Sequence, residues 1–497
     1  MNKLIEWMDG TDLKCLKGSA EVNVDEVIYD SRKARENAVF VCMMGSRIDS
    51  HTFIKDCYEK GVRTFVVEKE LGELELPEGE INIFKTEDVR NTLALLSAAR
   101  FGHPFEKLTS IAITGTKGKT TSSTMLKSVL EACGKKTGLI GTNGCFIDGV
   151  RTPTVNTTPE SYELHEDFRK MVDAGCEYVV MEVSSQAVKM KRTAGMMFDY
   201  GIFLNISPDH IGPNEHESFE EYMDCKAGVL RQCKKVIINA DARHSDEVLK
   251  LSGKKEAYRF SVNEALDECA RDIEYVMDTD FTGTYFKAEG VMNGFMRLPL
   301  PGYFNIENAL SVILVSGLLG LPADLTEKGI ESTSVNGRME VVARTDKYTI
   351  FVDYAHNEVS MVSLLKTLRE NYNPERLVIV FGCGGNRSKD RRTGMGAAAA
   401  HSADFSIFTS DNSRYEKPED IIADIKEAYL NAGGKEENCA CIVSRRDAIR
   451  YSMEHAKKGD MIAIIGKGHE DYQEENGVRT HFLDKEVILE EKEKLEA

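Results

Sequence analysis

A glycine-rich loop between a strand pattern and a helix pattern constrains the fold of this chain more than any other feature. Residues 108–114 (LTSIAIT) form a β-branched run, and residues 122–134 (SSTMLKSVLEACG) have helical apolar spacing, with Gly134 where a helix would end. Between them lies GTKGKTT, residues 115–121. A strand, a glycine loop and a helix in this order predict a parallel α/β sheet with an anion site at the helix N-terminus.

The loop predicts a bound nucleoside triphosphate. Its glycines let backbone N–H groups approach phosphate oxygens, Lys119 adds a cation, and the hydroxyl of Thr120 suits Mg²⁺. The spacer before the Gly-Lys-Thr is shorter than in the common nucleotide loop. A glycine turn without a ligand is the alternative, and the lysine and threonines argue against it. The candidate nucleotide contacts are Gly115, Thr116, Lys117, Gly118, Lys119, Thr120 and Thr121.

Strand and helix patterns alternate along most of the chain, and we expect a three-domain α/β protein. The strand patterns of the middle part lie at 178–185, 199–207 and 234–241, and those of a second series at 348–357, 375–385, 404–412, 439–444 and 460–468. We expect a smaller α/β N-terminal domain at 1–107, a central P-loop-type parallel sheet domain at 108–337, and a Rossmann-like C-terminal domain at 338–497.

Composition narrows the class of protein. The chain has 497 residues, 42% hydrophobic and 29% charged, with a formal net charge of −18, which is typical of a globular protein and argues against a nucleic-acid binder. No apolar run approaches a membrane span and no signal pattern opens the sequence, so we expect a cytoplasmic protein without membrane insertion. The 12 cysteines form no C-x-x-C pair, which predicts reduced thiols, with Cys439 and Cys441 on a strand.

A series of motifs extends this interpretation. After GTKGKTT, the chain carries NTTPES (156–161), MEVSSQ (181–186), PDH (208–210), FNIENAL (304–310), NGRME (336–340), VDYAHN (352–357), FGCGGNR (381–387), SDNSR (410–414) and GKGHEDYQ (466–473). In this order they resemble the Mur ligase family of peptidoglycan synthesis, and within it the ligases that add a diamino acid to UDP-N-acetylmuramoyl-L-alanyl-D-glutamate. The resemblance implies a cytoplasmic, ATP- and Mg²⁺-dependent ligase that forms an amide through an acyl phosphate, and we expect a monomer.

The resemblance also implies a catalytic set. Lys119, Glu182, His210 and Lys226 match the family's catalytic positions, and Thr120, Glu182, His210 and Lys226 match its Mg²⁺ ligands. Lys226 matches the lysine that carries a CO₂-derived carbamate (N6-carboxylysine) in the family. Without the resemblance, Glu182 would be a strand end, His210 a structural histidine and Lys226 an ordinary helix lysine.

Substrate contacts follow from the same resemblance. For ATP it gives Asn305 and Asn308 at the adenine, Arg338 at the terminal phosphate, and Asp353 at the ribose with His356 beside it. For the UDP-sugar it gives Ser31, together with the stretch 45–53, and then Thr157, Thr158, Ser184 and Arg192. Read alone, these are helix-start amides, turn hydroxyls and surface arginines.

The incoming amino acid is expected at Asp411, Asn412, Arg414, Arg387, Gly466 and Glu470. A guanidinium at Arg414 suits the distal carboxylate of meso-2,6-diaminopimelate, which L-lysine lacks. Four positions depart from the family pattern: Gln186, Glu358, Asn386 and Ser413. They leave open L-lysine as the substrate and a non-catalytic sugar-nucleotide-binding partner. Two further alternatives are a folylpolyglutamate-synthase-like ligase, which would share the loop, Glu182, His210 and Lys226, and a P-loop protein that only hydrolyses ATP, which would need neither TTPE nor GKGHE.

Overall fold

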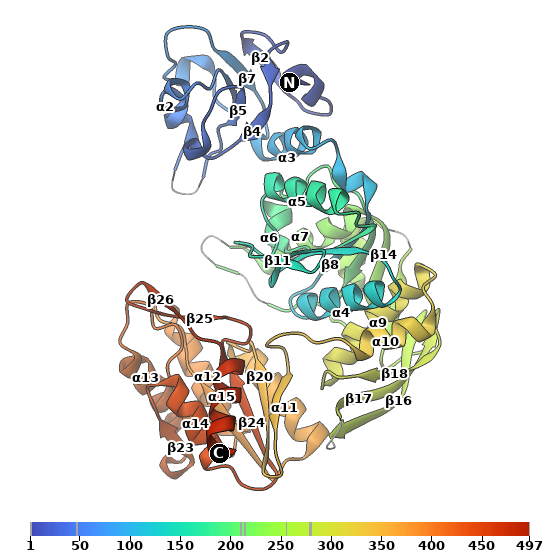
Figure 1. The fold of residues 1–497 in the computed structure, drawn as a ribbon, viewed down its shortest axis with the longest axis vertical. Coiled ribbons are helices and arrows are strands. Elements are labelled where there is room, and N and C mark those ends of the chain that lie inside the picture. The colour runs from blue at the N-terminus through green and yellow to red at the C-terminus, as the bar shows by residue number, and fades with distance from the viewer. Residues whose placement is uncertain are drawn as a thin grey trace. The chain divides into compact units, whose positions relative to one another are not determined.

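The computed structural model describes residues 2–45, 48–208, 211–212, 215–254, 256–277 and 281–496. The chain has a mixed α/β fold with three domains, as expected, each built around a sheet that contains parallel strands (Figure 1). It also divides into two compact units, Met1–Glu268 with Ser311–Pro322, and Cys269–Leu310 with Ala323–Ala497. The two units are described separately below.

The N-terminal sheet is a small α/β layer. Its strand order is β2 (Lys14–Lys17), β7 (Asn82–Lys85), β6 (Thr64–Val67), β5 (Ala38–Val41) and β4 (Glu26–Ile28), parallel except at β2. Residues alternate between its two faces along each strand. Val39 and Val41 pack with α1 (Leu4–Trp7) and α3 (Val89–Arg100), whereas Phe40 packs with α2 (Ile54–Glu59). A short pair, β1 (Asn2–Lys3) and β3 (Asn23–Val24), lies beside α1.

The central sheet confirms the predicted strand, loop and helix. Its strands follow the order β11 (Val150–Thr152), β10 (Gly144–Ile147), β9 (Thr137–Gly141), β12 (Tyr178–Glu182), β8 (Thr109–Thr114), β13 (Phe198–Phe203), β14 (Cys233–Asn239) and β15 (Tyr258–Ser261). From β9 to β15 the pairing is parallel, and β10 and β11 form an antiparallel edge. Gly134 has a positive φ of 71° and lies two residues past the end of its helix, directly after the C-cap Cys133, as predicted.

Helices cover both faces of this sheet. One face packs on α5 (Ser161–Asp173), α6 (Ser185–Lys189), α7 (Phe219–Arg231) and α8 (Ser245–Ser252). The helix that follows the loop, α4 (Lys119–Ala132), packs against β8, β9 and β12. Because the strands are buried on both faces, they are continuous apolar runs, and the carboxyl ends of β8, β9 and β12 lie together at one edge.

The second unit opens with a part that the sequence patterns did not predict. It contains β16 (Glu268–Met277), β17 (Thr282–Gly290) and β18 (Gly294–Leu298), the last two paired antiparallel. The next helix, α9 (Tyr303–Leu318), belongs to this unit as far as Leu310, and α10 (Ala323–Glu331) belongs to it entirely. Along β17, buried Thr284, Phe286 and Ala288 alternate with less buried residues, which is typical of a sheet with one wet face.

The C-terminal sheet is doubly wound. Its strand order is β19 (Glu340–Arg344), β20 (Tyr348–Asp353), β24 (Asp460–Ile465), β21 (Arg376–Phe381), β22 (Phe405–Phe408) and β23 (Cys439–Cys441), parallel except at β19. One face packs on α11 (Glu358–Tyr372), α12 (Lys389–Ser402) and α13 (Pro418–Asn431), the other on α14 (Arg445–Glu454) and α15 (Asp484–Glu496). The hairpin of β25 (Tyr472–Glu475) and β26 (Val478–His481) follows β24. The strands predicted in this series are all present.

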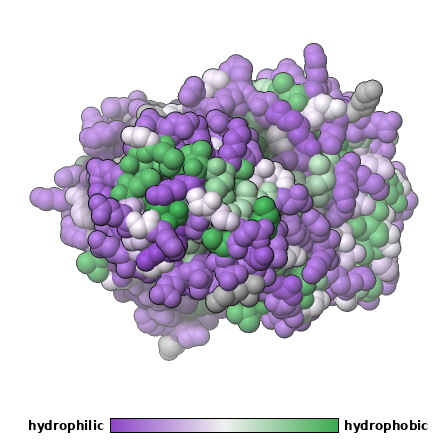
Figure 2. Space-filling model, turned by 90° about the horizontal axis from the view of Figure 1, so that it is seen from above, coloured by the Kyte–Doolittle hydropathy of each residue, from purple (hydrophilic) through white to green (hydrophobic). Residues whose placement is uncertain are grey.

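The surface is predominantly hydrophilic. Figure 2 shows one face on which charged and polar side chains surround limited apolar patches. Among the described residues, none of the helices combines the length and apolarity that a membrane span requires. All twelve cysteines are described and all are free thiols, with Cys439 and Cys441 on β23 as expected.

Candidate functional site

The glycine loop is held in place by hydrogen bonds to the backbone and the side chain of Asn205. Gly118 has a left-handed φ of 86° and directly precedes α4, so a side chain there would be strained. The N–H of Thr116 donates to the carbonyl of Asn205 at 3.0 Å, and the N–H of Lys117 donates to Asn205 Oδ1 at 2.9 Å. The ammonium of Lys119 lies over the loop, 2.7 Å from the carbonyl oxygen of Gly115. This geometry suits an anion at the start of α4.

Directly beside this loop, the carboxylate of Glu182 accepts hydrogen bonds from several hydroxyl groups. It ends β12, is 1% exposed, and its carboxylate accepts bonds from Thr120 Oγ1 at 3.1 Å and from Ser123 Oγ at 3.4 Å. Thr142, which follows β9, donates to the same carboxylate through Oγ1 at 3.0 Å and through N–H at 3.2 Å. At Gly141 a Cβ would lie 2.2 Å from Glu182 Oε1, so only glycine leaves room for the carboxylate.

The donor set fits a hard divalent cation. Carboxylate and hydroxyl oxygens are the ligands that Mg²⁺ prefers, and Glu182 and Thr120 bring one of each to the first turn of α4. Of the other expected metal ligands, His210 lies outside the described residues. Lys226, on α7, is 1% exposed, and its ammonium lies 4.7 Å from the ring centroid of Tyr222. The hydroxyl of Tyr222 is 2.9 Å from Thr116 Oγ1, which links this part of α7 to the loop.

The expected UDP-sugar residues of the central domain form a second group near Glu182. Thr158 donates through Oγ1 to the carbonyl of Glu182 at 2.9 Å and accepts from the N–H of Ser184 at 3.1 Å. Thr157 Oγ1 is 3.1 Å from Thr142 Oγ1. Arg192 donates to the carbonyl of Thr158 at 3.0 Å and to the carboxylate of Glu160 at 2.7 Å, so this cation is part of a local ion pair. The structure therefore brings Thr157, Thr158, Ser184 and Arg192 together.

Ser31 lies in the N-terminal domain, at the start of a 3₁₀ turn (Ser31–Lys33). Asp30 caps this turn by accepting from the N–H of Arg32 at 2.9 Å, and Lys60 donates to the carbonyl of Ser31 at 3.0 Å. Part of the neighbouring 45–53 stretch falls on residues that the structure does not describe.

The other residues expected at the nucleotide, apart from those of the loop, lie in two groups within the second unit. Asn305 and Asn308 are buried on α9, joined by a bond of 3.1 Å from Asn308 Nδ2 to Asn305 Oδ1. Asp353 ends β20 and accepts from the N–H groups of Met339 at 2.8 Å and Ala355 at 2.7 Å.

Tyr354 is the centre of the second group. The guanidinium of Arg338 lies 4.6 Å from its ring centroid, and the rings of His356 and His469 lie at 4.8 and 5.0 Å. Burial, reinforced by the nearby Glu470 carboxylate, raises the pKa of Tyr354 to about 12. The phenol therefore keeps its proton at neutral pH and serves as a hydrogen-bond donor.

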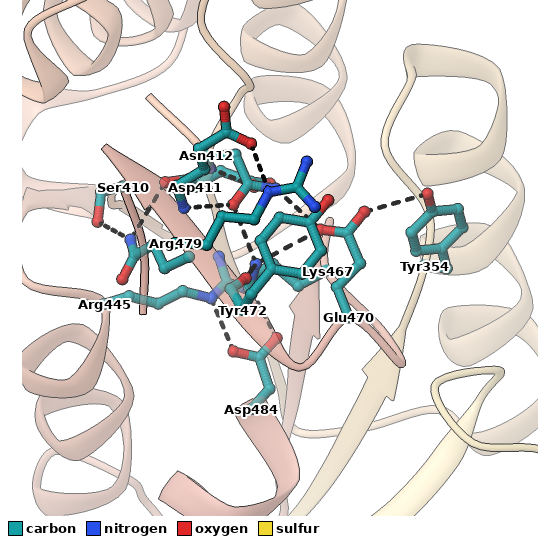
Figure 3. A network of polar contacts seen from close by, with 12 residues as sticks. Tyr354, Ser410, Asp411, Asn412, Arg445, Lys467, Glu470, Tyr472, Arg479 and Asp484 are labelled. Carbon is teal, nitrogen blue, oxygen red and sulfur yellow. Dashed lines mark hydrogen bonds and ion pairs between the residues drawn. The ribbon is translucent and has the colours of Figure 1, made fainter. Parts of the chain in front are cut away.

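The expected amino-acid residues converge on a polar network in the C-terminal domain (Figure 3). Glu470 accepts bonds from the amide of Asn412 at 2.9 Å and from the hydroxyl of Tyr354 at 3.3 Å. Asp411 is 9% exposed, and at Gly466, where φ is 109°, a Cβ would lie 2.9 Å from Asp411 Oδ2. The structure thus places Asp411, Asn412, Gly466 and Glu470 side by side.

The two expected arginines differ in their surroundings. Arg414 has a positive φ of 52°, and its Nη1 donates to the carbonyl of Gly385 at 2.8 Å. Its backbone N–H donates to the carbonyl of Glu474 at 3.0 Å, which ties it to the β25 hairpin. Arg387 is exposed on the loop after β21.

The four residues that depart from the family pattern lie in different local environments. Asn386 has φ 54° and accepts from the N–H of Tyr415 at 3.2 Å, a role that the side chain of an asparagine in a left-handed conformation suits. Glu358 begins α11, Ser413 is buried in the motif that carries Arg414, and Gln186 lies on α6.

Several residues at these sites were missed by the sequence analysis. Ser123 and Thr142 complete the set of hydroxyl groups that donate to Glu182. The sequence feature that could have identified them is a hydroxyl residue near the start of α4 and another directly after β9. Tyr354 and Lys467 lie inside quoted motifs, between residues that were singled out. Gly337 and Gly468 approach so closely that a Cβ on Gly337 would lie 2.3 Å from the Gly468 carbonyl carbon.

Comparisons with known proteins agree with this geometry. Residues 23–101 match the Mur ligase family catalytic domain, residues 113–316 the Mur ligase middle domain, and residues 337–468 the Mur ligase glutamate ligase domain. Two curated relatives are both named UDP-N-acetylmuramoyl-L-alanyl-D-glutamate--2,6-diaminopimelate ligase. The one from Clostridium perfringens is 39% identical, covering 97% of each chain, and the one from Clostridium botulinum is 38% identical, covering 94% of this chain and 95% of the relative.

A solved structure gives the same result for the fold. The structure of UDP-N-acetylmuramoyl-L-alanyl-D-glutamate--2,6-diaminopimelate ligase superimposes with a TM-score of 0.73 at 27% identity, over 100% of this chain and 99% of that one. The similarity extends from the N-terminal sheet to the C-terminal sheet in both kinds of comparison. This chain therefore belongs to the Mur ligase family.

Proposed function

We propose that this protein is an ATP-dependent ligase that joins meso-2,6-diaminopimelate to UDP-N-acetylmuramoyl-L-alanyl-D-glutamate in the cytoplasm. The observation that carries the proposal is the Glu182 carboxylate, which meets the Thr120 hydroxyl at the first turn after a glycine loop. The names of the relatives supply the substrates, because they match this chain over nearly its whole length.

The chemistry of amide formation suits this site. An oxygen of the substrate carboxylate attacks the γ-phosphorus of ATP and ADP leaves, which gives an acyl phosphate. The amine nitrogen then attacks the acyl carbon, phosphate leaves, and the nitrogen loses a proton. Both steps demand positioning and neutralisation of phosphate charge.

This chain's residues supply that neutralisation in separate ways. The first turn of α4, directly after Gly118, would present backbone N–H groups to phosphate oxygens, and Lys119 adds a cation over the loop. Glu182 and Thr120 would hold Mg²⁺, which when bound offsets the charge of the phosphate oxygens. The roles given by the family to His210, Lys226 as a carbamate, Asn305, Asn308 and Arg338 stay predictions, as does the monomeric state.

The domain boundaries at 107/108 and 337/338 are part of the proposal. The three family matches, which begin at residues 23, 113 and 337, support them.

The amino acid is the sharpest point to test. We propose that Arg414 contacts the distal carboxylate of diaminopimelate, supported by its place beside Asn412 and the β25 hairpin. Glu470 suits an ammonium of the same substrate.

The deciding experiment measures phosphate release by the purified protein with ATP, Mg²⁺ and UDP-N-acetylmuramoyl-L-alanyl-D-glutamate, with meso-diaminopimelate or L-lysine in parallel, and confirms product masses. We expect turnover with diaminopimelate. Turnover with lysine alone would overturn the amino-acid assignment and keep the ligase. Phosphate release that needs neither amino acid nor UDP-sugar would indicate an ATPase instead.

A further inference from the structure

Lys467 is a buried cation at the centre of the amino-acid network, and the proposed function assigns it no role. It lies two residues after β24, next to Gly466, and its side chain is 0% exposed. Its ammonium donates to the carbonyl of Tyr472 and lies 3.4 Å from both Asn412 Oδ1 and Glu470 Oε2 (Figure 3). Because water does not reach it, Lys467 acts on a substrate only through its neighbours.

Its first effect is on the orientation of an amide. Asn412 Oδ1 accepts from the N–H of Glu474 at 2.9 Å and faces the Lys467 ammonium. The opposite side of the amide, Nδ2, is therefore turned toward Glu470 Oε2, 2.9 Å away. A flipped amide would place NH₂ against both the ammonium and an N–H donor, and would lose these bonds. Lys467 thus helps to select the orientation in which Asn412 holds Glu470.

Its second effect is on charge. Arg445 and Asp484 form a fully buried ion pair with a distance of 2.7 Å, so these two neutralise each other. Next to them lie the carboxylates of Asp411 and Glu470 and the ammonium of Lys467. Within this group of three, the ammonium of Lys467 offsets one of the two carboxylate charges. Loss of the lysine would leave two carboxylates without their buried counter-charge.

A tight turn keeps the two partners in register. The N–H of Glu470 donates to the carbonyl of Lys467 at 2.9 Å, and Gly468 within the turn has a positive φ of 52°. The turn places both side chains in the same network, and Tyr354 adds its hydroxyl to the other oxygen of Glu470 at 3.3 Å. Each of the two carboxylate oxygens of Glu470 thus has a donor of its own.

We propose that Lys467 is a positioning residue that sets Asn412 and Glu470 to bind the amino group of the incoming diamino acid. The inference rests on the proposed ligase function and goes one step further, since it assigns amino-acid affinity to a residue that does not touch the substrate. It predicts that Lys467 controls the KM for the amino acid and leaves the KM values for ATP and the UDP-sugar unchanged.

The test uses the full-length enzyme with ATP, Mg²⁺ and UDP-N-acetylmuramoyl-L-alanyl-D-glutamate. Lys467→Met should raise the KM for diaminopimelate by about 30-fold or more, with the KM for ATP changed by less than about twofold. Arg479→Met is the matched control. It removes an exposed cation of the β25–β26 hairpin, a guanidinium that pairs with Glu474 at 3.0 Å. This control should change the KM for diaminopimelate by less than about threefold.

A double-variant cycle separates positioning from general stability. If Lys467 acts through Glu470, Lys467→Met combined with Glu470→Gln should cost no more than Glu470→Gln alone. Independent, multiplying losses would overturn the proposal, and so would an equal rise in the KM values of all three substrates. If Lys467→Met alone does not fold, the double variant Lys467→Met with Glu470→Gln, which removes one charge of each sign, is compared with Glu470→Gln. If neither Lys467→Met nor the double variant folds, Lys467 serves the fold and the proposal is overturned as well.

The outcome also distinguishes this inference from the proposed function. A wild-type enzyme without amino-acid-dependent turnover would contradict the function itself. A wild-type enzyme that turns over diaminopimelate, with a Lys467→Met variant of unchanged KM, would contradict only the positioning role.

Discussion

Two carboxylates, Glu182 in the central domain and Glu470 in the C-terminal domain, are held in opposite ways. Glu182 accepts bonds from hydroxyl and backbone N–H groups of Thr120, Ser123 and Thr142, all of them uncharged. Glu470 accepts from an amide and a phenol and lies beside the ammonium of Lys467.

This contrast indicates where each of the two sites obtains its positive charge. The neutral shell of Glu182 leaves its charge to be met by a cation from solution, which agrees with a proposed Mg²⁺ site. The Glu470 network contains its own cation, the ammonium of Lys467. We therefore expect a metal ion at the first site and an amine at the second.

The largest effect is expected where the phosphate loop itself is broken. Lys119→Ala should lower the rate of ligation by about 10³-fold or more, because it removes the ammonium that lies over the loop at the start of α4. Amino-acid-dependent phosphate release measures it, and Lys127→Ala, on the same helix and paired with Glu131 at 2.7 Å, is the control. Substantial residual activity of Lys119→Ala would contradict the phosphate role.

The neutral shell is tested next. Glu182→Gln keeps the size of the side chain and removes its charge, so it should lower kcat by about 10²-fold and raise the Mg²⁺ concentration required for half-maximal activity. The measurement is ATP-dependent ligation titrated with Mg²⁺. An unchanged Mg²⁺ dependence would remove Glu182 from the metal site and with it the contrast with Glu470.

The amine-binding side is sharpened by the choice of substrate. Arg414→Ala should weaken kcat/KM for diaminopimelate by about 30-fold, since a lost charge-assisted bidentate contact costs roughly 2 kcal/mol. Any activity with L-lysine should fall much less, because lysine lacks the distal carboxylate. Equal losses for both amino acids would indicate that Arg414 serves the loop around Gly385 rather than the substrate.

A smaller effect concerns stability and extends the comparison to buried polar groups. His165 on α5 is 3% exposed, and among the described residues neither of its ring nitrogens has a hydrogen-bond partner. Burial lowers its pKa to about 3. The folded state therefore keeps the ring neutral while the unfolded chain binds a proton below its ordinary pKa of about 6.5. This stabilising contribution is complete above about pH 6.5 and declines as the pH falls toward 3.

Between pH 7 and pH 5 the loss should amount to about 1–2 kcal/mol. Urea unfolding at both pH values measures it, and His165→Leu should remove this part of the pH dependence. The buried pair Arg445–Asp484 has a guanidinium whose pKa is raised above its ordinary value by the carboxylate, and burial opposes this. This pair should add no comparable change of the free energy of unfolding between pH 7 and pH 5. A pH dependence that survives in His165→Leu would point to other groups.

The sequence predicted the parts of this molecule that local patterns determine. The strand at 108–114, the shortened loop and the helix after it form one continuous segment, so spacing and glycine positions were sufficient. The C-terminal strands were predicted for the same reason, since each is a short apolar run with a turn behind it.

What it did not predict depends on distant residues. The antiparallel pair of β17 and β18 was missed although Gly290 and Asn293 mark the turn between the two strands. Thr142 reaches Glu182 from forty positions away, and Lys467 reaches Asn412 from fifty-five, so neither residue is distinctive in its own segment. The functional assignments beyond the loop came from the family resemblance, which the comparisons confirm at the level of the family.

The close approach of Gly337 and Gly468 limits how the amino-acid specificity of this enzyme can be redesigned. Neither position has room for a Cβ, since one on Gly337 would meet the Gly468 backbone at 2.3 Å and one on Gly468 would meet the Tyr354 Cβ at 2.8 Å. The segment that carries Arg338 and the turn that carries Glu470 are consequently locked backbone to backbone. Variants in which the turn around Glu470 is lengthened or changes direction would displace Arg338 as well. Changes of specificity are therefore better sought on the loop that carries Arg414.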